Sequence, residues 1–163
     1  MKVMILSDSH TMNKTTLETL LKNNHVDYYI HCGDIYKPYH PISQTKFYLA
    51  KGNNDFDCYI HDELLITIDD HRFFITHGHR YGVSYSLEHL INITKEKKAD
   101  IVCFGHTHRP YFIKTDTLTI INPGSVYYSR GAYKKPTYCI YDTANESVTF
   151  YDATTLSPCN PFV

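Results

Sequence analysis

"IVCFGHTHRP" (residues 101–110) joins four apolar residues to a glycine, two histidines at alternate positions and a proline. The apolar run predicts a buried strand. Residues two apart in extended backbone point the same way, so His106 and His108 would face one point if the strand continued past Gly105. A loop with two exposed histidines fits the same letters. The rest of the chain has to distinguish a metal site from such a loop.

Length and charge narrow the class of protein. At 163 residues the chain is expected to form one domain, residues 1–163, with a core of its own. A net charge of -1 gives no basic field, so neither nucleic acid nor an anionic membrane is an expected partner. The first apolar run stops at Ser7, and no segment approaches the roughly 20 apolar residues of a membrane span. We therefore expect a cytoplasmic protein.

Cysteine and tyrosine usage adds two expectations. The five cysteines are odd in number and contain no CxxC pair, so we expect small buried side chains rather than disulfides or a zinc ribbon. Tyrosine is abundant, with 15 residues, and clusters beside turn residues in "YKPYHP" (36–41) and "YYSRGAY" (127–133). These clusters fit a wall of a binding site, a subunit contact or ordinary surface packing, and the second of these would make the protein a homodimer.

The order of apolar runs predicts an α/β fold. Strands are predicted over 2–6, 27–32, 46–51 and 99–104, and amphipathic helices over 13–24 and 84–98. This alternation indicates a partly parallel sheet covered by helices. Hairpins are predicted over 63–76, 111–124 and 136–152. The chain thus combines a βα half with a hairpin-rich half, and no composition shift marks a domain boundary.

Polar side chains stand at the ends of the predicted strands. The apolar runs lead into SDSH (7–10), GD (33–34), GNND (52–55), THGH (76–79) and GHTH (105–108). Loops at the carboxyl ends of strands in an α/β sheet line one crevice, so these groups should converge. Carboxylate, amide and imidazole groups without thiolate suit Mn²⁺, Fe²⁺, Co²⁺ or Zn²⁺. Their number exceeds what one ion needs.

Five motifs in this order resemble the calcineurin-like metallophosphoesterases. They are DxH at Asp8 and His10, GD at Asp34, GN with a following aspartate at Asn53, HGH at His77, and GHTH at 105–108. The short length and "NPGS" (122–125) are most similar to the small bacterial and archaeal phosphodiesterase branch, which includes the retromer subunit Vps29. The resemblance covers roughly residues 1–152. It implies a four-layer αββα sandwich, two mixed β-sheets flanked by helices.

The resemblance also implies a dinuclear metal site. One ion would be held by Asp8, His10 and His108, the other by Asn53, His77 and His106, with Asp34 bridging. The alternate histidines of GHTH would then serve different ions. Two divalent ions are expected, Mn²⁺ first, with Fe, Ni, Co or Zn as alternatives. The implied reaction is hydrolysis of a small phosphoester by a hydroxide bridging the ions, with Asp34, Asn53 and His79 as the expected catalytic residues.

The chain departs from the family pattern at one position. Many relatives carry histidine after the GN asparagine, where it is thought to protonate the leaving group, but this chain has Asn54, which is no acid at neutral pH. His79 is the nearest substitute, and a structural part for His79 is the alternative. Asn54, His79, Arg80 and Arg109 are candidate substrate contacts, whereas pairing with a nearby carboxylate is the other reading of both arginines.

Family membership leaves a second class of function open, because Vps29 shares this fold and acts as a scaffold. The complete set of expected ligands favours the enzyme. Ser125 is not expected to act as a nucleophile, since no histidine and aspartate are arranged around it in the chain. His31 fits either a second-layer donor to a ligand or a hydrogen-bonded histidine of the sheet.

Overall fold

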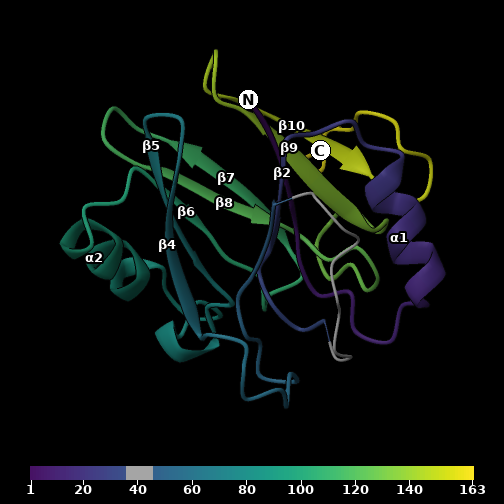
Figure 1. Ribbon diagram of the computed structural model, residues 1–163, viewed down its shortest axis with the longest axis horizontal. Coiled ribbons are helices and arrows are strands. Elements are labelled where there is room, and N and C mark those ends of the chain that lie inside the picture. Colours follow the sequence, from purple (N-terminus) through teal and green to yellow (C-terminus); the bar gives the residue numbers. More distant parts are fainter. Residues whose placement is uncertain (36–45) are drawn as a thin grey trace.

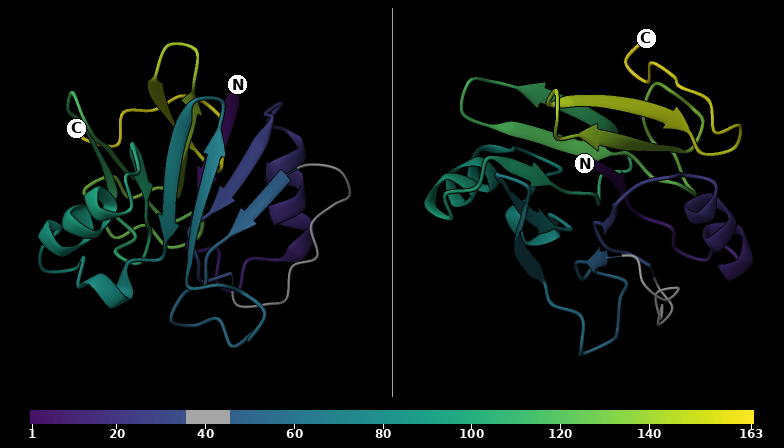
Figure 2. Two further views of the ribbon diagram at one scale, coloured as in Figure 1. Left: turned by 60° about the vertical axis from the view of Figure 1, so that its left-hand side comes forward. Right: turned by 45° about the horizontal axis from the view of Figure 1, so that its top comes forward.

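The computed structural model describes residues 1–35 and 46–163. Two five-stranded mixed sheets pack face to face, and helix α1 (Lys14–Lys22) and helix α2 (Glu88–Glu96) lie on opposite outer sides (Figures 1 and 2). The expected α/β sandwich is therefore confirmed. The tyrosine cluster at 36–41 lies outside the described residues.

The first sheet has the order β10-β9-β1-β2-β3. Strands β1 (Lys2–Leu6), β2 (Tyr28–His31) and β3 (Lys46–Leu49) are parallel. The hairpin of β9 (Thr137–Asp142) and β10 (Ser147–Asp152) adds to β1 in antiparallel register. Asn13 is the N-cap of α1, because its side-chain oxygen accepts a hydrogen bond of 2.8 Å from the backbone N–H of Thr15.

The second sheet has the order β4-β5-β6-β8-β7. Strands β5 (His71–Thr76), β6 (Ile101–Cys103) and β8 (Thr119–Pro123) are parallel. The antiparallel edge strands are β4 (Glu63–Ile68) and β7 (Pro110–Lys114). All three predicted hairpins are present. A short 3-10 helix, η1 (His79–Tyr81), was not predicted, and α2 begins at Glu88 rather than at 84.

Alternation of side chains builds three layers of core. Along β1, Val3 and Ile5 face the space between the sheets, whereas Met4 and Leu6 pack against α1. Strand β6 does the same, because its odd-numbered residues face the first sheet and Val102 faces α2. Strands buried on both faces explain the continuous apolar runs of the sequence. No helix in the described ranges is long and apolar enough to cross a membrane.

Three of the five cysteines are buried, namely Cys32, Cys103 and Cys139, as expected for small apolar side chains. Cys58 is exposed and Cys159 is half-buried, so the expectation holds for most of the cysteines, three of the five. All five are free thiols. The buried three lie in the layer between the two sheets, where burial raises the pKa of each thiol. They are therefore core residues and not ligands.

Candidate metal centre

The polar motifs gather at one end of the sandwich, because each follows the carboxyl end of a parallel strand. Asp8 and His10 follow β1, Asp34 follows β2, and Asn53 follows β3. From the second sheet, His77 follows β5, and His106 and His108 follow β6. Backbone hydrogen bonds join neighbouring loops within each set, with Gly105 N–H donating to the carbonyl of His77 and Asp8 N–H to that of Gly33. Between the two sets, His106 N–H donates to Asp8 Oδ2 at 3.1 Å. The predicted convergence is present.

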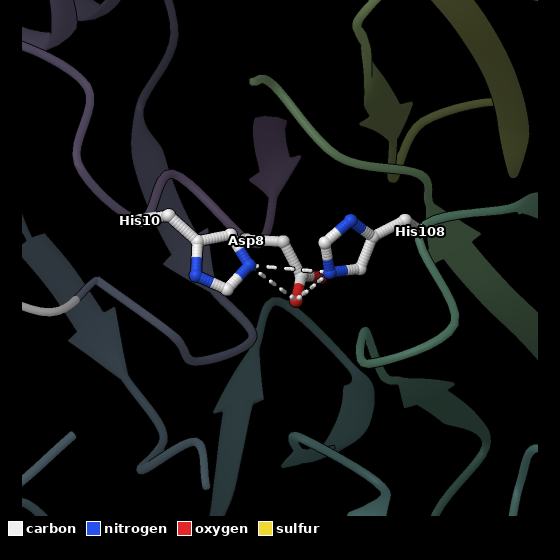
Figure 3. A group of neighbouring side chains, drawn as sticks. All are labelled: Asp8, His10 and His108. Carbon is white, nitrogen blue, oxygen red and sulfur yellow. Dashed lines mark hydrogen bonds and ion pairs between the residues drawn. The ribbon is translucent and has the colours of Figure 1, made fainter. Parts of the chain in front are cut away.

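Asp8, His10 and His108 form the first group of ligand-type side chains (Figure 3). The Nε2 atoms of His10 and His108 lie 3.2 Å apart. Asp8 Oδ1 lies 3.2 Å from His108 Nε2 and 3.8 Å from His10 Nε2. Asp8 is fully buried, and its Oδ1 has no hydrogen-bond partner among the described residues. An unpartnered buried carboxylate oxygen facing two imidazole nitrogens is a fitting place for a cation.

The second group is centred on His77. Its Nε2 lies 3.4 Å from Asp34 Oδ2, 3.9 Å from Asp8 Oδ1 and 3.1 Å from Asn53 Oδ1. Asn53 Oδ1 is also 3.0 Å from His106 Nδ1. Asp34 Oδ2 lies 3.8 Å from His10 Nε2, so this carboxylate stands between the two groups. Asp8 reaches both groups as well, since it shares one cluster with His10 and His108 and another with Asp34 and His77.

Backbone carbonyls fix the orientation of two histidines. His77 Nδ1 donates to the carbonyl of Cys32 at 2.8 Å, and His108 Nδ1 donates to the carbonyl of Tyr128 at 2.7 Å. A neutral imidazole with its proton on Nδ1 presents a lone pair at Nε2. Both Nε2 lone pairs therefore point into the centre at other acceptors. Such an arrangement is typical of metal-binding histidines, whose second nitrogen is held by a carbonyl or carboxylate.

The backbone of the site is strained. Five of the seven ligand-type residues have left-handed conformations, with φ of 55° at Asp8, 43° at His10, 57° at Asp34, 67° at His106 and 58° at His108. This conformation is unfavourable for residues other than glycine and is concentrated at functional sites. It also corrects the reasoning from alternation. Strand β6 ends at Cys103 and the chain then turns sharply, so His106 and His108 face different groups rather than the one point that a continued strand would give them.

The electrostatics of the centre favour ionised carboxylates. Burial would raise the pKa of Asp8 and Asp34, but the opposing contributions are larger in sum. For Asp8 these come from the nearby imidazoles of His108 and His77, and for Asp34 from His77 and Asn54, so the pKa of each carboxyl is lowered. Burial lowers the pKa of His10 and His106. At His77 burial is outweighed by the carboxylates of Asp34 and Asp8, which raise the pKa of this imidazole. The centre therefore offers two carboxylates, and His10 and His106 favour the neutral form that binds metal.

Several residues without an assigned role hold the ligands in place. Asp55 Oδ2 accepts hydrogen bonds from the N–H groups of Asp34 and Gly52, both 2.8 Å long. Asn122 Nδ2 donates to the carbonyl of Gly105 at 2.9 Å. Ser125 Oγ donates to the carbonyl of Asp8 at 2.8 Å. All three stand inside motifs that the sequence singled out, Asp55 in GNND (52–55) and both Asn122 and Ser125 in NPGS (122–125).

The four candidate substrate contacts differ in their surroundings. Asn54 binds Asp34 instead of facing outward, with N–H to Oδ1 at 2.8 Å and Nδ2 to Oδ2 at 2.6 Å. Arg80 forms an ion pair of 2.9 Å with Asp62, the alternative considered for it. Arg109 is exposed beside His108. The ring of His79 lies 5.4 Å from that of His77 and 6.2 Å from that of His106, and its Nδ1 is buried without a partner among the described residues.

His31 lies beneath the centre and is fully buried. Its Nδ1 accepts from the N–H of Gly33 at 3.2 Å, and its Nε2 lies 3.1 Å from Ser9 Oγ. Burial lowers the pKa of His31 to about 4. The neutral ring uses both nitrogens, so a proton would remove the Gly33 hydrogen bond and leave a buried charge.

Acid should therefore destabilise the metal-free protein through His31. Its folded-state pKa is below the unfolded value of about 6.5, so stability is lost as the pH falls from 6.5 toward 4, by at most about 1.4 kcal/mol per pH unit. We expect His31→Gln to flatten the decline of the melting temperature between pH 7.5 and 5. The matched variant His61→Gln, at an exposed position, should keep the wild-type slope. Equal slopes in all three proteins would show that His31 is not the responsible group.

The fold and the centre together define a class: an α/β sandwich with a cluster of carboxylate, amide and imidazole ligands at the carboxyl ends of its strands. The family model for the calcineurin-like phosphoesterase superfamily domain matches residues 1–146. The chain is 36% identical over 157 residues to the probable metallophosphoesterase YsnB of Bacillus subtilis, covering 93% of this chain and 91% of that protein. The chain belongs to the calcineurin-like phosphoesterase superfamily.

Further relatives agree. A phosphodiesterase of Methanocaldococcus jannaschii is 33% identical over 145 residues, covering 76% of this chain and 83% of that protein. The crystal structure of a predicted phosphoesterase from Streptococcus pneumoniae matches with a TM-score of 0.84 at 24% identity, over 94% and 90% of the two chains. Vps29 of Entamoeba histolytica, solved with Zn²⁺, matches with a TM-score of 0.72 at 18% identity, over 93% and 91%. The named relatives support phosphoester hydrolysis as the reaction class.

Proposed function

We propose that this protein is a phosphodiesterase that uses two divalent metal ions to hydrolyse small phosphoesters. The observation that carries the proposal is the convergence of seven oxygen and nitrogen ligands, with the buried oxygen of Asp8 facing the lone pair of His108 at 3.2 Å. Asp8, His10 and His108 would hold one ion, and Asn53, His77 and His106 the other. Asp34 would contact both, because it stands between His10 and His77.

The donor set fits such ions. It contains two carboxylates, one amide oxygen and four imidazoles without thiolate, which suits Mn²⁺, Fe²⁺, Co²⁺, Ni²⁺ or Zn²⁺. When bound, two ions supply an activated water for in-line attack on phosphorus and offset charge on the phosphoryl oxygens. The chain's own part is to orient the ligands: Cys32 and Tyr128 carbonyls fix two imidazoles, and Asn54 holds Asp34. Mn²⁺ is the first ion to test.

The test is hydrolysis of bis-p-nitrophenyl phosphate by metal-stripped protein before and after addition of Mn²⁺. We expect turnover to depend on the added ion and to vanish again on chelation. Fe²⁺, Co²⁺, Ni²⁺ and Zn²⁺ are assayed in parallel, because the same ligands accept them. Bound metal without turnover under any of these ions would refute the enzymatic proposal.

The absence of an acid at Asn54 predicts a steep dependence of rate on the leaving group. Asn54 is engaged with Asp34 and carries no proton to give. We expect diesters with acidic phenols to be cleaved much faster than alkyl diesters, as measured by kcat across a series of substituted phenyl esters. If His79 donates the proton instead, His79→Gln should steepen this dependence further. If kcat of the wild type were the same for all leaving groups in this series, the assignment of a weak or missing acid would be contradicted.

A scaffold is the second candidate function, favoured by the structural match to Vps29 with a TM-score of 0.72. At 18% identity this likeness shows the fold alone. The scaffold reading requires no complete ligand set, whereas the described residues supply all seven expected side chains at one end of the sandwich. Metal-dependent turnover distinguishes the two readings directly.

A further inference from the structure

Two adjacent tyrosines, Tyr127 and Tyr128, lie at the edge of the candidate metal centre. They follow β8 in the segment that begins with Ser125. The ring of Tyr128 lies 6.1 Å from that of His10, and the ring of His10 lies 5.0 Å from that of His108. The Tyr127 and Tyr128 rings contact each other with centroids 4.2 Å apart. The pair therefore flanks the first group of ligands.

Hydrogen bonds tie this pair rigidly to the ligands. Ser125 Oγ accepts from the N–H groups of Tyr127 at 3.0 Å and Tyr128 at 2.7 Å, and donates to the carbonyl of Asp8. The Tyr128 carbonyl accepts from His108 Nδ1. The same backbone therefore fixes both the tautomer of a ligand and the position of the aromatic pair.

Despite this anchoring, the two side chains are open to solvent, with Tyr127 36% and Tyr128 53% exposed. Single exposed aromatic residues need no explanation. Two contacting rings beside a ligand differ. The Tyr127 and Tyr128 rings meet edge to face with their planes at 65°, so each restrains the other and the ordering cost of a ring that stacks on a ligand is reduced. Tyrosine rings stack on planar groups, and a base on an aromatic ring contributes about 1–3 kcal/mol to binding.

We propose that Tyr128, restrained by its edge-to-face contact with Tyr127, forms a stacking platform for a planar aromatic group of the phosphoester, a nucleobase or an aryl ring. The inference rests on the proposed function, since it places the phosphoryl group at the neighbouring ligands and one ester substituent on the platform. It names a substrate class, aromatic phosphodiesters, and makes Tyr128 a specificity-determining residue. It also assigns the "YYSRGAY" cluster to the site wall rather than to a subunit contact.

The test is calorimetric binding to the Mn²⁺-loaded protein with three phosphomonoesters: adenosine 5′-phosphate, phenyl phosphate and ribose 5-phosphate. We expect an aromatic ester to bind about tenfold more tightly than ribose 5-phosphate, the equivalent of about 1.4 kcal/mol. Tyr128→Leu should reduce this ratio toward one without weakening ribose 5-phosphate. Tyr128→Phe, which keeps the ring, should retain the ratio. Preference for the adenosine ester indicates a nucleobase, and preference for the phenyl ester a simple aryl ring.

Two results would overturn the platform. One is equal affinity of the wild type for all three esters, or a ratio that Tyr128→Leu leaves unchanged. The other is a wild-type dimer, seen by sedimentation, that Tyr128→Leu dissociates without altering the ratio. Because binding is measured without turnover, failure of the enzymatic proposal is distinguishable: it appears as no hydrolysis of bis-p-nitrophenyl phosphate while the ratio persists.

Discussion

Asp34→Asn should abolish turnover of bis-p-nitrophenyl phosphate, with a loss in kcat well above a hundredfold. Changes to residues that merely position ligands already cost about 10- to 100-fold in metal affinity or activity, and Asp34 stands between both groups of ligands. The substitution removes the negative charge and one acceptor oxygen while keeping the shape. Metal content after dialysis against Mn²⁺ should fall together with the rate.

The control for Asp34→Asn is Asp116→Asn, the same exchange at an exposed turn between β7 and β8. It should leave rate and metal content at wild-type values. Circular dichroism separates loss of the site from loss of the fold, because Asp34 is not part of a strand and its removal leaves all three core layers intact. Wild-type turnover and metal content in Asp34→Asn would show that this carboxylate does not join the two ions.

Gly52→Ala should disable the site by a different route. A Cβ at Gly52 would lie 2.1 Å from Asp34 Oδ1 and 2.3 Å from the Asp34 backbone nitrogen. Backbone cannot move aside as a flexible side chain can, so the loop carrying Asp34 must shift. Overpacking of this kind typically costs about 1–3 kcal/mol of stability. We expect a lower melting temperature and at least a tenfold loss of Mn²⁺ affinity.

Gly131→Ala is the matched control, since its added Cβ meets Pro110 Cδ at 3.4 Å, an ordinary contact. It should retain wild-type stability and Mn²⁺ affinity. Metal affinity and melting temperature are measured on all three proteins, by titration calorimetry and thermal unfolding. Unchanged affinity in Gly52→Ala would mean that the position of Asp34 does not matter for metal binding, contrary to its proposed role.

The sequence predicted the location of the site because the signal was topological. Apolar runs that end in Asp8, Asp34 or His77 must bring those residues to one edge once the strands are parallel, whatever the local backbone does. The three hairpins could also be predicted, because each shows two strand-like runs separated by turn residues. The seven ligand-type residues themselves were assigned from the resemblance of their motifs to the family, since topology alone places the loops but does not choose the ligands.

The features of the site that the sequence did not reveal depend on backbone atoms and on contacts made only in the tertiary structure. The backbone carbonyls of Cys32 and Tyr128 orient two histidines. Every residue has such a carbonyl, so the residue type gives no sign of this role. The left-handed conformations of His106 and His108 are imposed by the surrounding fold against their intrinsic preference. Arg80 had a phosphate and a carboxylate as equal candidate partners, and only the proximity of β4 shows that Asp62 is the one it contacts.

The most direct test of the central claim is a Mn²⁺ titration of the metal-free wild-type protein, with bound ions counted by equilibrium dialysis and turnover measured on the same samples. Two proposed groups of ligands joined by Asp34 predict two ions per chain, with hydrolysis of bis-p-nitrophenyl phosphate reaching its maximum only as the second ion binds. Saturation at one ion per chain with full turnover, or two bound ions with no turnover, would contradict the account.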